Sequence, residues 1–282
     1  MRESLDDTIG GKEDLDRLQP ELPVLAQIPY EPHAKKAIEL VTTGRPNSAG
    51  AEAYRSLRTS IQFLSIERPL KALQVTSPRS GDGKTTTIAN LAVALAGADQ
   101  RVIVLDCDLR RSRQHEVFKV SNEVGFTAVV LGDAPLSKAL QTPAGYGGQL
   151  RVLPAGRHIS NPSELLSSQR TGEILASLGE IADLVLIDSP PVLPVTDAVA
   201  LAPRVDATIL LVAAGQTTGK DLAHSLEVLG QVSAPVVGAV INASTPQHGY
   251  GYRYHGYHYR YPYEPYPGRS RQKDQPAGSV PS

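Results

Sequence analysis

Apolar residues along the chain gather in short runs that longer amphipathic stretches separate. Six of these runs lie between positions 71 and 243, are rich in aliphatic and β-branched residues, and have the length of a strand. Several are almost entirely apolar, as expected of strands that helices cover on both faces. The predicted strands span residues 71–77, 101–108, 150–156, 183–190, 207–214 and 235–243.

The stretches between these runs carry apolar residues at helical spacing, which predicts helices over 49–64, 83–96, 163–178 and 218–231. Strands that alternate with helices form parallel sheets covered on both faces. We therefore predict an α/β domain over residues 47–245, with a three-layer, doubly wound and mainly parallel sheet. Ligands of such sheets bind beyond the carboxyl ends of the strands.

The two ends of the chain differ from this pattern. Residues 1–46 are polar and interrupted by Pro and Gly, apart from the apolar stretch 22–28, which is able to add a strand or dock on a neighbour. We interpret residues 1–46 as a docking segment, juxtamembrane if the chain is a piece of a membrane protein. Residues 246–282 contain few aliphatic residues and are predicted to be disordered. This tail holds eight of the eleven tyrosines: Tyr250, Tyr252, Tyr254, Tyr257, Tyr259, Tyr261, Tyr263 and Tyr266.

Composition narrows the class of protein. The chain has 282 residues, of which 41% are hydrophobic, enough for one sizeable core. A net charge of -1 provides no general attraction to nucleic acid, so we expect no nucleic-acid partner. The single cysteine, Cys107, lies in an apolar run and is expected to be a small buried core residue in a reducing compartment. The first residues, MRESLDDTIGG, are too acidic for a signal peptide, and we expect a soluble domain.

A glycine-rich loop joins the first predicted strand of the domain to an amphipathic stretch, in the order strand, PRSGDGKTTT, ANLAVALAG. This order is typical of a phosphate-binding P-loop, in which glycines let backbone N–H groups point at phosphate oxygens. Lys84 would then reach the β and γ phosphates, and the Thr85 hydroxyl would bind Mg²⁺. Pro78 departs from the pattern by replacing its first glycine. The residues expected to bind the nucleotide are Ser80, Gly81, Asp82, Gly83, Lys84, Thr85 and Thr86.

Two further predicted strands end in carboxylates: VIVLDCDLRR carries Asp106 and Asp108, and DLVLIDSPP carries Asp188. One such aspartate alone would be read as a helix cap or a turn residue. Two such strands in a chain with a P-loop instead favour metal and phosphate chemistry, because their ends meet at one edge of the sheet.

These boxes resemble the second Walker A-like box and the Walker B box of the bacterial tyrosine kinase (BY-kinase) family. The segments LPAG at 153–156, NPSELL at 161–166 and GAVINA at 238–243 extend the resemblance. It implies a P-loop NTPase fold of the deviant-Walker-A type, in which Asp188 holds Mg²⁺ directly or through water. Asp106 and Asp108 would complete the metal shell, one of them accepting a tyrosine proton. Asn242 would read the adenine edge, with an ordinary turn asparagine as the alternative.

The resemblance also implies an activity and partners. It implies an ATP-dependent protein-tyrosine kinase that phosphorylates tyrosines of its own tail and regulates capsular or exopolysaccharide synthesis and export. The place of action would be the cytoplasmic face of the cell membrane. A transmembrane chain-length or activator domain, fused or separate, and a cognate tyrosine phosphatase would be the partners.

The motif E-x-x-R-x-x-R at Glu52, Arg55 and Arg58 places three charges along one helical face. In isolation this pattern is a solvated stripe. The resemblance implies that it packs subunits into a ring-like homo-oligomer, in which one subunit's tail enters the next subunit's site.

Two alternatives use the same fold. Chromosome-partitioning and division-site ATPases share the boxes but carry a lysine early in the loop, where this chain has Arg79. A nucleotide-switched scaffold without catalysis is the other alternative. The tyrosine cluster in the tail favours a kinase over both, because a mobile tether can feed successive hydroxyls into a neighbouring site.

Overall fold

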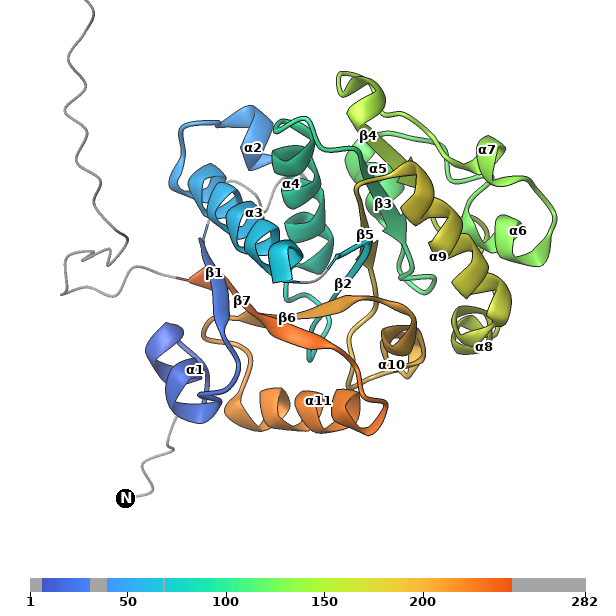
Figure 1. Ribbon diagram of the computed structural model, residues 1–282. Helices are drawn as coiled ribbons and strands as arrows, with labels where there is room; N and C mark the ends of the chain where they lie inside the picture. Colours follow the sequence, from blue (N-terminus) through green and yellow to red (C-terminus); the bar gives the residue numbers. More distant parts are fainter. Residues whose placement is uncertain (1–6, 31–39, 68, 245–282) are drawn as a thin grey trace, which may run out of the picture. The chain divides into compact units, whose positions relative to one another are not determined.

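The computed structural model describes residues 7–30, 40–67 and 69–244. Its centre is a sheet of seven parallel strands in the order β1-β7-β6-β2-β5-β3-β4 (Figure 1). The strands are β1 (Val24–Pro29), β2 (Ala72–Thr76), β3 (Val102–Asp106), β4 (Leu150–Leu153), β5 (Leu184–Asp188), β6 (Ala207–Ala213) and β7 (Val236–Ser244).

All six strands predicted from the apolar runs are present. The seventh, β1, comes from the apolar stretch near the start of the chain and pairs with β7 at the sheet edge, with Val24 opposite Ala239. Of the two alternatives for this stretch, the added strand is therefore the one observed. The early segment thus contributes to the same compact unit as the rest of the described chain. The predicted tail, with its eight tyrosines, lies outside the described residues.

Helices cover both faces of the sheet (Figure 1). One face packs against α3 (Ala49–Glu67), α4 (Lys84–Ala96) and α5 (Gln114–Phe118), and α2 (Val41–Gly44) contacts α3 and α4. On the other face, α6 (Phe126–Leu131), α7 (Leu136–Ala139), α8 (Pro162–Ser167) and α9 (Gln169–Ile181) pack near β3, β4 and β5. The same face holds α1 (Lys12–Leu18), α10 (Asp197–Leu201) and α11 (Gly219–Gln231) near β6 and β7. Short 3₁₀ turns lie at Gly147–Gln149 and Ala202–Arg204.

The apolar stretch 163–178, predicted as one helix, forms two. The break lies at Ser168, whose backbone is extended (φ -66°, ψ 153°) and whose hydroxyl accepts a hydrogen bond from the N–H of Thr171. Serine is a favoured N-cap because this bond satisfies an N–H that has no partner inside the helix. The apolar periodicity continues across the cap, so it does not reveal the break.

The core is aliphatic, as the absence of tryptophan requires. Alternate residues of each strand face opposite layers, so that Leu73 packs toward α3 and α4 while Ala72 packs toward α9. Cys107 is fully buried, as predicted. In the described ranges, we find no helix with the length and apolar character needed to cross a bilayer.

Candidate functional site

The loop between β2 and α4 has the backbone of a phosphate cradle. Gly81 and Gly83 have φ of 92° and 100°, a left-handed conformation that L side chains rarely adopt. A Cβ at Gly83 would also lie 2.1 Å from Nδ2 of Asn242, so this position excludes a side chain on two grounds. Gly83 is the N-cap of α4, whose first N–H groups therefore face the loop. The two glycines therefore provide the left-handed backbone that the turn of this loop requires.

Three hydrogen bonds hold this loop in shape. The carboxylate of Asp82 accepts the N–H of Arg79 at 3.0 Å, and the hydroxyl of Ser77 donates to the carbonyl of Arg79 at 2.6 Å. The amide of Asn242, from the end of β7, donates to the carbonyl of Asp82 at 2.7 Å. Burial raises the pKa of Asp82. The Asp82 carboxylate is engaged by the loop itself, so the group of Asp82 that remains to donate a hydrogen bond to a phosphate is its backbone N–H. Adenine reading by Asn242 stays a prediction.

Lys84, at the start of α4, is only 7% exposed. Its ammonium donates to the hydroxyl of Ser77 at 3.0 Å. Burial lowers the pKa of Lys84, while the charges of Asp188, Asp82 and Asp108 act in the opposite direction. A buried ammonium gains most from an anion that replaces the water it has lost, which is the situation that a bound phosphate provides.

Two buried carboxylates end neighbouring strands beside this lysine. Asp106 of β3 and Asp188 of β5 are direct partners in the strand register, and their exposed fractions are 0% and 1%. Burial raises the pKa of Asp188 to about 6, and the hydroxyl of Thr85, the amide of Gln114 and the charge of Lys84 oppose this shift. Burial, and then the charge of Asp188, raise the pKa of Asp106 well above its ordinary value. Two such groups are stabilised by a proton or a cation between them.

The hydrogen bonds of the two carboxylates differ. Asp106 accepts three backbone N–H groups, from Asp108 at 3.2 Å and from Arg113 and Gln114 at 3.0 Å each. Oδ2 of Asp188 accepts Nε2 of Gln114 at 2.8 Å. Oδ1 of Asp188 is buried and has no hydrogen-bond partner within the described part of the chain. A buried carboxylate oxygen without a partner is costly, and it is a natural place for a cation or its bound water.

An ion pair ties together the loops that follow the two strands. The guanidinium of Arg110 donates two hydrogen bonds to Asp197, at 2.7 and 3.0 Å. Asp197 is fully buried in the first turn of α10 and also accepts the hydroxyl of Ser163 at 2.5 Å. The pair of Arg110 with Asp197 therefore holds the segments after β3 and β5 together as one unit.

Arg79, in the place where the ATPase relatives carry a lysine, is engaged within its own chain. Its guanidinium makes two contacts of 3.0 Å with the carboxylate of Asp221, and its side chain is 62% exposed. Asp221 belongs to the capping box that opens α11, together with Thr218. The pair therefore fastens the phosphate loop to the start of α11.

The three charged residues of the α3 motif have different partners. Glu52 and Arg55 lie at the surface and pair at 2.7 Å, and Arg55 also donates to the carbonyl of Pro46 at 2.9 Å. Arg58 instead donates to the carbonyl of Ala94 at 3.0 Å. Ala94 lies near the C-terminal end of α4, where the helix dipole stabilises a positive charge. Two of the three predicted interface residues are therefore surface groups, and the third joins α3 to α4.

The structure thus brings most of the predicted site residues to one edge of the sheet. Lys84, Asp108, Asp188 and the carboxylate of Asp82 interact electrostatically, and Asp106 lies beside Asp188. Ser80 is exposed at the outside of the loop, while Thr85 and Thr86 are half-buried at the start of α4. Sequence reasoning missed Gln114, because no motif marks it in the polar run RRSRQHE.

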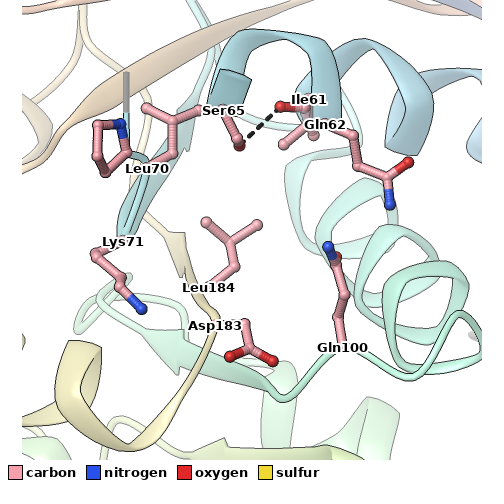
Figure 2. A pocket seen from close by; sticks show the side chains of 9 residues that line it. Ile61, Gln62, Ser65, Leu70, Lys71, Gln100, Asp183 and Leu184 are labelled. Atoms are coloured by element: carbon pink, nitrogen blue, oxygen red, sulfur yellow. Dashed lines mark hydrogen bonds between the residues drawn. The ribbon is translucent and has the colours of Figure 1, made fainter. Parts of the chain in front are cut away.

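A cavity of about 240 Å³ lies at the opposite end of the strands (Figure 2). Lys71, Gln100 and Asp183 line it, just before β2, β3 and β5 begin, together with residues from the last turns of α3. The carboxylates and the phosphate loop lie where these strands end. The cavity is therefore separate from the candidate site.

A phosphate cradle, a buried lysine and two buried carboxylates at the carboxyl edge of a parallel sheet define a P-loop nucleotide-binding protein. A family model described as an AAA domain matches residues 70–233. The chain is 35% identical over 215 residues to the tyrosine-protein kinase YwqD of Bacillus subtilis, covering 76% of this chain and 90% of that one. It therefore belongs to the family of bacterial tyrosine-protein kinases.

Two further similarities agree. The tyrosine-protein kinase etk of Escherichia coli K12 is 35% identical over 222 residues, which are 79% of this chain but only 30% of that protein. The solved kinase domain of the Escherichia coli tyrosine kinase ETK has a TM-score of 0.79 and 31% identity, and the match covers 86% of this chain and 97% of that one. The chain thus spans nearly all of the Bacillus relative and under a third of the longer one.

Proposed function

We propose that the chain is an ATP- and Mg²⁺-dependent protein-tyrosine kinase that phosphorylates the tyrosines of its own tail. One observation carries the proposal: the buried Lys84 shares the carboxyl edge of the sheet with two buried carboxylates, and an oxygen of Asp188 has no hydrogen-bond partner among the residues that the structure describes. The lysine would bind an anion and the carboxylates a cation at the same edge of the sheet. The names of the relatives support tyrosine as the acceptor.

The donor set fits magnesium. Oxygen atoms of Thr85, Asp106, Asp108 and Asp188 are the kind of ligand that this hard cation prefers. Across residues 7–30, 40–67 and 69–244, no group of three or more His, Cys, Asp or Glu forms a metal cage. Magnesium in nucleotide sites takes one or two carboxylates and fills its remaining positions with phosphates and water, which agrees with this arrangement. When bound, the ion supplies positive charge to the transferring phosphoryl group.

The chain's own groups would then act by position and charge. The N–H groups of the loop and the first turn of α4 would hold the β and γ phosphates, and Lys84 would neutralise charge that develops on them. Asp106 or Asp108 would accept the proton of the tyrosine hydroxyl as its oxygen attacks phosphorus in line. Asn242 would contact the adenine.

The acceptors would be the eight tail tyrosines, from Tyr250 to Tyr266. Transfer between subunits of a ring-like oligomer is part of the proposal, and the exposed Glu52 and Arg55 on α3 support it. Each phosphate adds roughly -1.5 to -2 charges at neutral pH, so phosphates on three tyrosines would reverse the small positive charge of the tail and repel neighbouring subunits. By its resemblance to the family, the protein would regulate polysaccharide synthesis and export at the cytoplasmic face of the membrane. Its partners there would be a transmembrane activator domain and a tyrosine phosphatase.

The test is incubation of the purified chain with ATP and Mg²⁺, followed by mass spectrometry of phosphotyrosine. We expect phosphotyrosine within residues 250–266 and none in Lys84→Ala. Hydrolysis of ATP without phosphotyrosine would replace this proposal with the partition-type ATPase. Nucleotide binding with neither hydrolysis nor label would favour the scaffold.

Removal of residues 246–282 separates the acceptor from the enzyme. The shortened chain should lose most of the label and keep nucleotide binding. Mixed with full-length Lys84→Ala, which has a tail but no activity, the shortened chain should label the variant's tail. Absence of that label, with an active enzyme present, would exclude transfer between subunits.

A further inference from the structure

We propose that Gln114 is a positioning residue that sets the orientation of the Asp188 carboxylate for magnesium binding. The inference rests on the nucleotide and magnesium site proposed above. Gln114 is fully buried at the start of α5. Its Nε2 donates to Oδ2 of Asp188 at 2.8 Å and to the carbonyl of Thr85 at 3.2 Å, and its backbone N–H donates to Oδ2 of Asp106 at 3.0 Å.

These contacts fix which way the amide of Gln114 points. A primary amide nitrogen has two hydrogens and a carbonyl oxygen has none, so the group facing two acceptors must be the nitrogen. The opposite orientation would place the Gln114 oxygen against a carboxylate of Asp188 and a carbonyl of Thr85. Both hydrogens of Nε2 are therefore used, and the amide has one stable orientation in this pocket.

A fixed amide has a consequence for Asp188. Its bond occupies Oδ2, so the carboxylate is held with Oδ1 free, the buried oxygen without a partner among the described residues. The free oxygen is the one left for a cation or its water. Groups that hydrogen-bond to metal ligands orient them, and their loss typically lowers metal affinity 10- to 100-fold.

Gln114 also joins three separate parts of the site. Thr85 follows the phosphate loop, Asp106 ends β3 and Asp188 ends β5, and Gln114 contacts all three. No sequence motif marks this position, at the start of α5. Loss of the side chain leaves the backbone bond to Asp106 in place and removes the two bonds that reach Thr85 and Asp188.

A purely structural role is the competing explanation, and Gln74 provides a matched control. Gln74 is also a fully buried glutamine, and its Nε2 donates to the hydroxyl of Ser189 at 3.0 Å and to the carbonyl of Ala198 at 2.9 Å. It has no hydrogen bond to the site carboxylates. Gln74→Met and Gln114→Met remove the same amide from equally buried positions, and the Gln74 oxygen also accepts the hydroxyl of Thr208 at 3.4 Å, so Gln74→Met should cost at least as much stability.

The experiment measures the Kd of ADP by calorimetry on the full chain, once with Mg²⁺ and once with EDTA. The ratio of the two values is the gain in affinity due to magnesium. In Gln114→Met we expect this gain to fall about tenfold, while the Kd in EDTA stays within about twofold of the native value. Gln114→Asn should behave alike, because its amide is one methylene too short to span both acceptors. Gln74→Met should keep the native gain.

Each result has one meaning. If the native chain binds no ADP, or gains nothing from Mg²⁺, the proposed site itself fails. If the native chain shows the gain and Gln114→Met keeps it within about twofold, the positioning role is overturned. If Gln114→Met does not fold, Gln114→Asn decides by the same ratio. Equal loss with Mg²⁺ and with EDTA would show damage to the whole nucleotide site and would also overturn the role.

Discussion

Strand β5 has an aspartate at each end, and the two carboxylates have opposite surroundings. Asp183, just before the strand, is 40% exposed and accepts the backbone N–H of Arg101 at 2.9 Å and its guanidinium at 2.7 Å. These hydrogen bonds lower the pKa of Asp183. Asp188, the last residue of the strand, is 1% exposed, lacks a cationic hydrogen-bond partner among the described residues, and has a pKa that burial raises to about 6.

The two carboxylates therefore have different roles: the charge of Asp183 stabilises the fold, whereas the charge of Asp188 is destabilising until a cation binds. The ionised form of Asp183 is favoured by folding, because its partner is part of the same structure. The ionised form of Asp188 is disfavoured by folding and becomes favourable when a cation arrives. The same residue type thus contributes to stability at the amino end of the sheet and to binding at the carboxyl end.

The largest expected difference between the two aspartates is in their effect on the rate of phosphorylation. Asp188→Asn keeps an acceptor for Gln114 but removes the charge that would attract Mg²⁺. We expect the rate of phosphotyrosine formation to fall by about 10³-fold, the equivalent of several kcal/mol of transition-state stabilisation. Asp183→Asn, at the other end of the strand, should stay within about twofold of the native rate. Initial rates by mass spectrometry check this, and comparable losses in both variants would contradict it.

The same substitution should have the reverse effect on stability. Without nucleotide or metal at pH 8, Asp188→Asn should be more stable than the native chain by roughly 1 to 3 kcal/mol, because a shift from 3.8 to about 6 penalises the buried charge. As the pH falls below about 6, the folded native chain takes up a proton that the unfolded chain does not bind until about pH 4. The difference in stability between the variant and the native chain therefore shrinks through this window and disappears near pH 4. Urea denaturation in EDTA at several pH values measures the difference, and a variant less stable than native at pH 8 would refute the account.

A smaller effect is expected at the amino end. The folded pKa of Asp183 lies below its unfolded value of 3.8, so its contribution to stability is present above pH 4 and is lost as the pH falls through the folded pKa. Both partners of the pair are substantially exposed, so the loss in Asp183→Asn should be smaller than the gain in Asp188→Asn. It should shrink further in about 1 M salt. A double-mutant cycle with Arg101→Gln checks it, and a coupling that salt leaves unchanged would speak against a solvent-screened pair.

Much of this arrangement was predictable from the sequence, for a physical reason. An apolar run such as VIVLD must be buried on both faces, and parallel strands bring their carboxyl ends to one edge. The positions of Asp106 and Asp188 therefore follow from local pattern, as does the curl of the loop at Gly81 and Gly83.

The missed features depend on contacts between distant segments. Arg110 pairs with Asp197 across 87 positions, and Gln114 reaches Asp188 across 74. Neither contact is marked in the sequence by a periodic pattern or by a local motif. The orientation of Arg58 toward the end of α4 was likewise hidden, because a spacing of three says which face a residue shares and not which side chains turn inward.

The smallest expected effect concerns the cavity at the amino end (Figure 2). Ser65 lines it, and its hydroxyl donates to the carbonyl of Ile61 one turn earlier in α3. Ser65→Leu would place apolar volume toward the cavity at an exposed position, so stability should change by about 0.5 kcal/mol or less, and the rate of phosphotyrosine formation should stay within about twofold. The reacting groups lie at the carboxyl ends of the strands, so filling a cavity at the amino ends should not change the reaction rate. A rate that falls tenfold, with unchanged stability, would show that the two ends of the sheet communicate and that the cavity belongs to the working part of the protein.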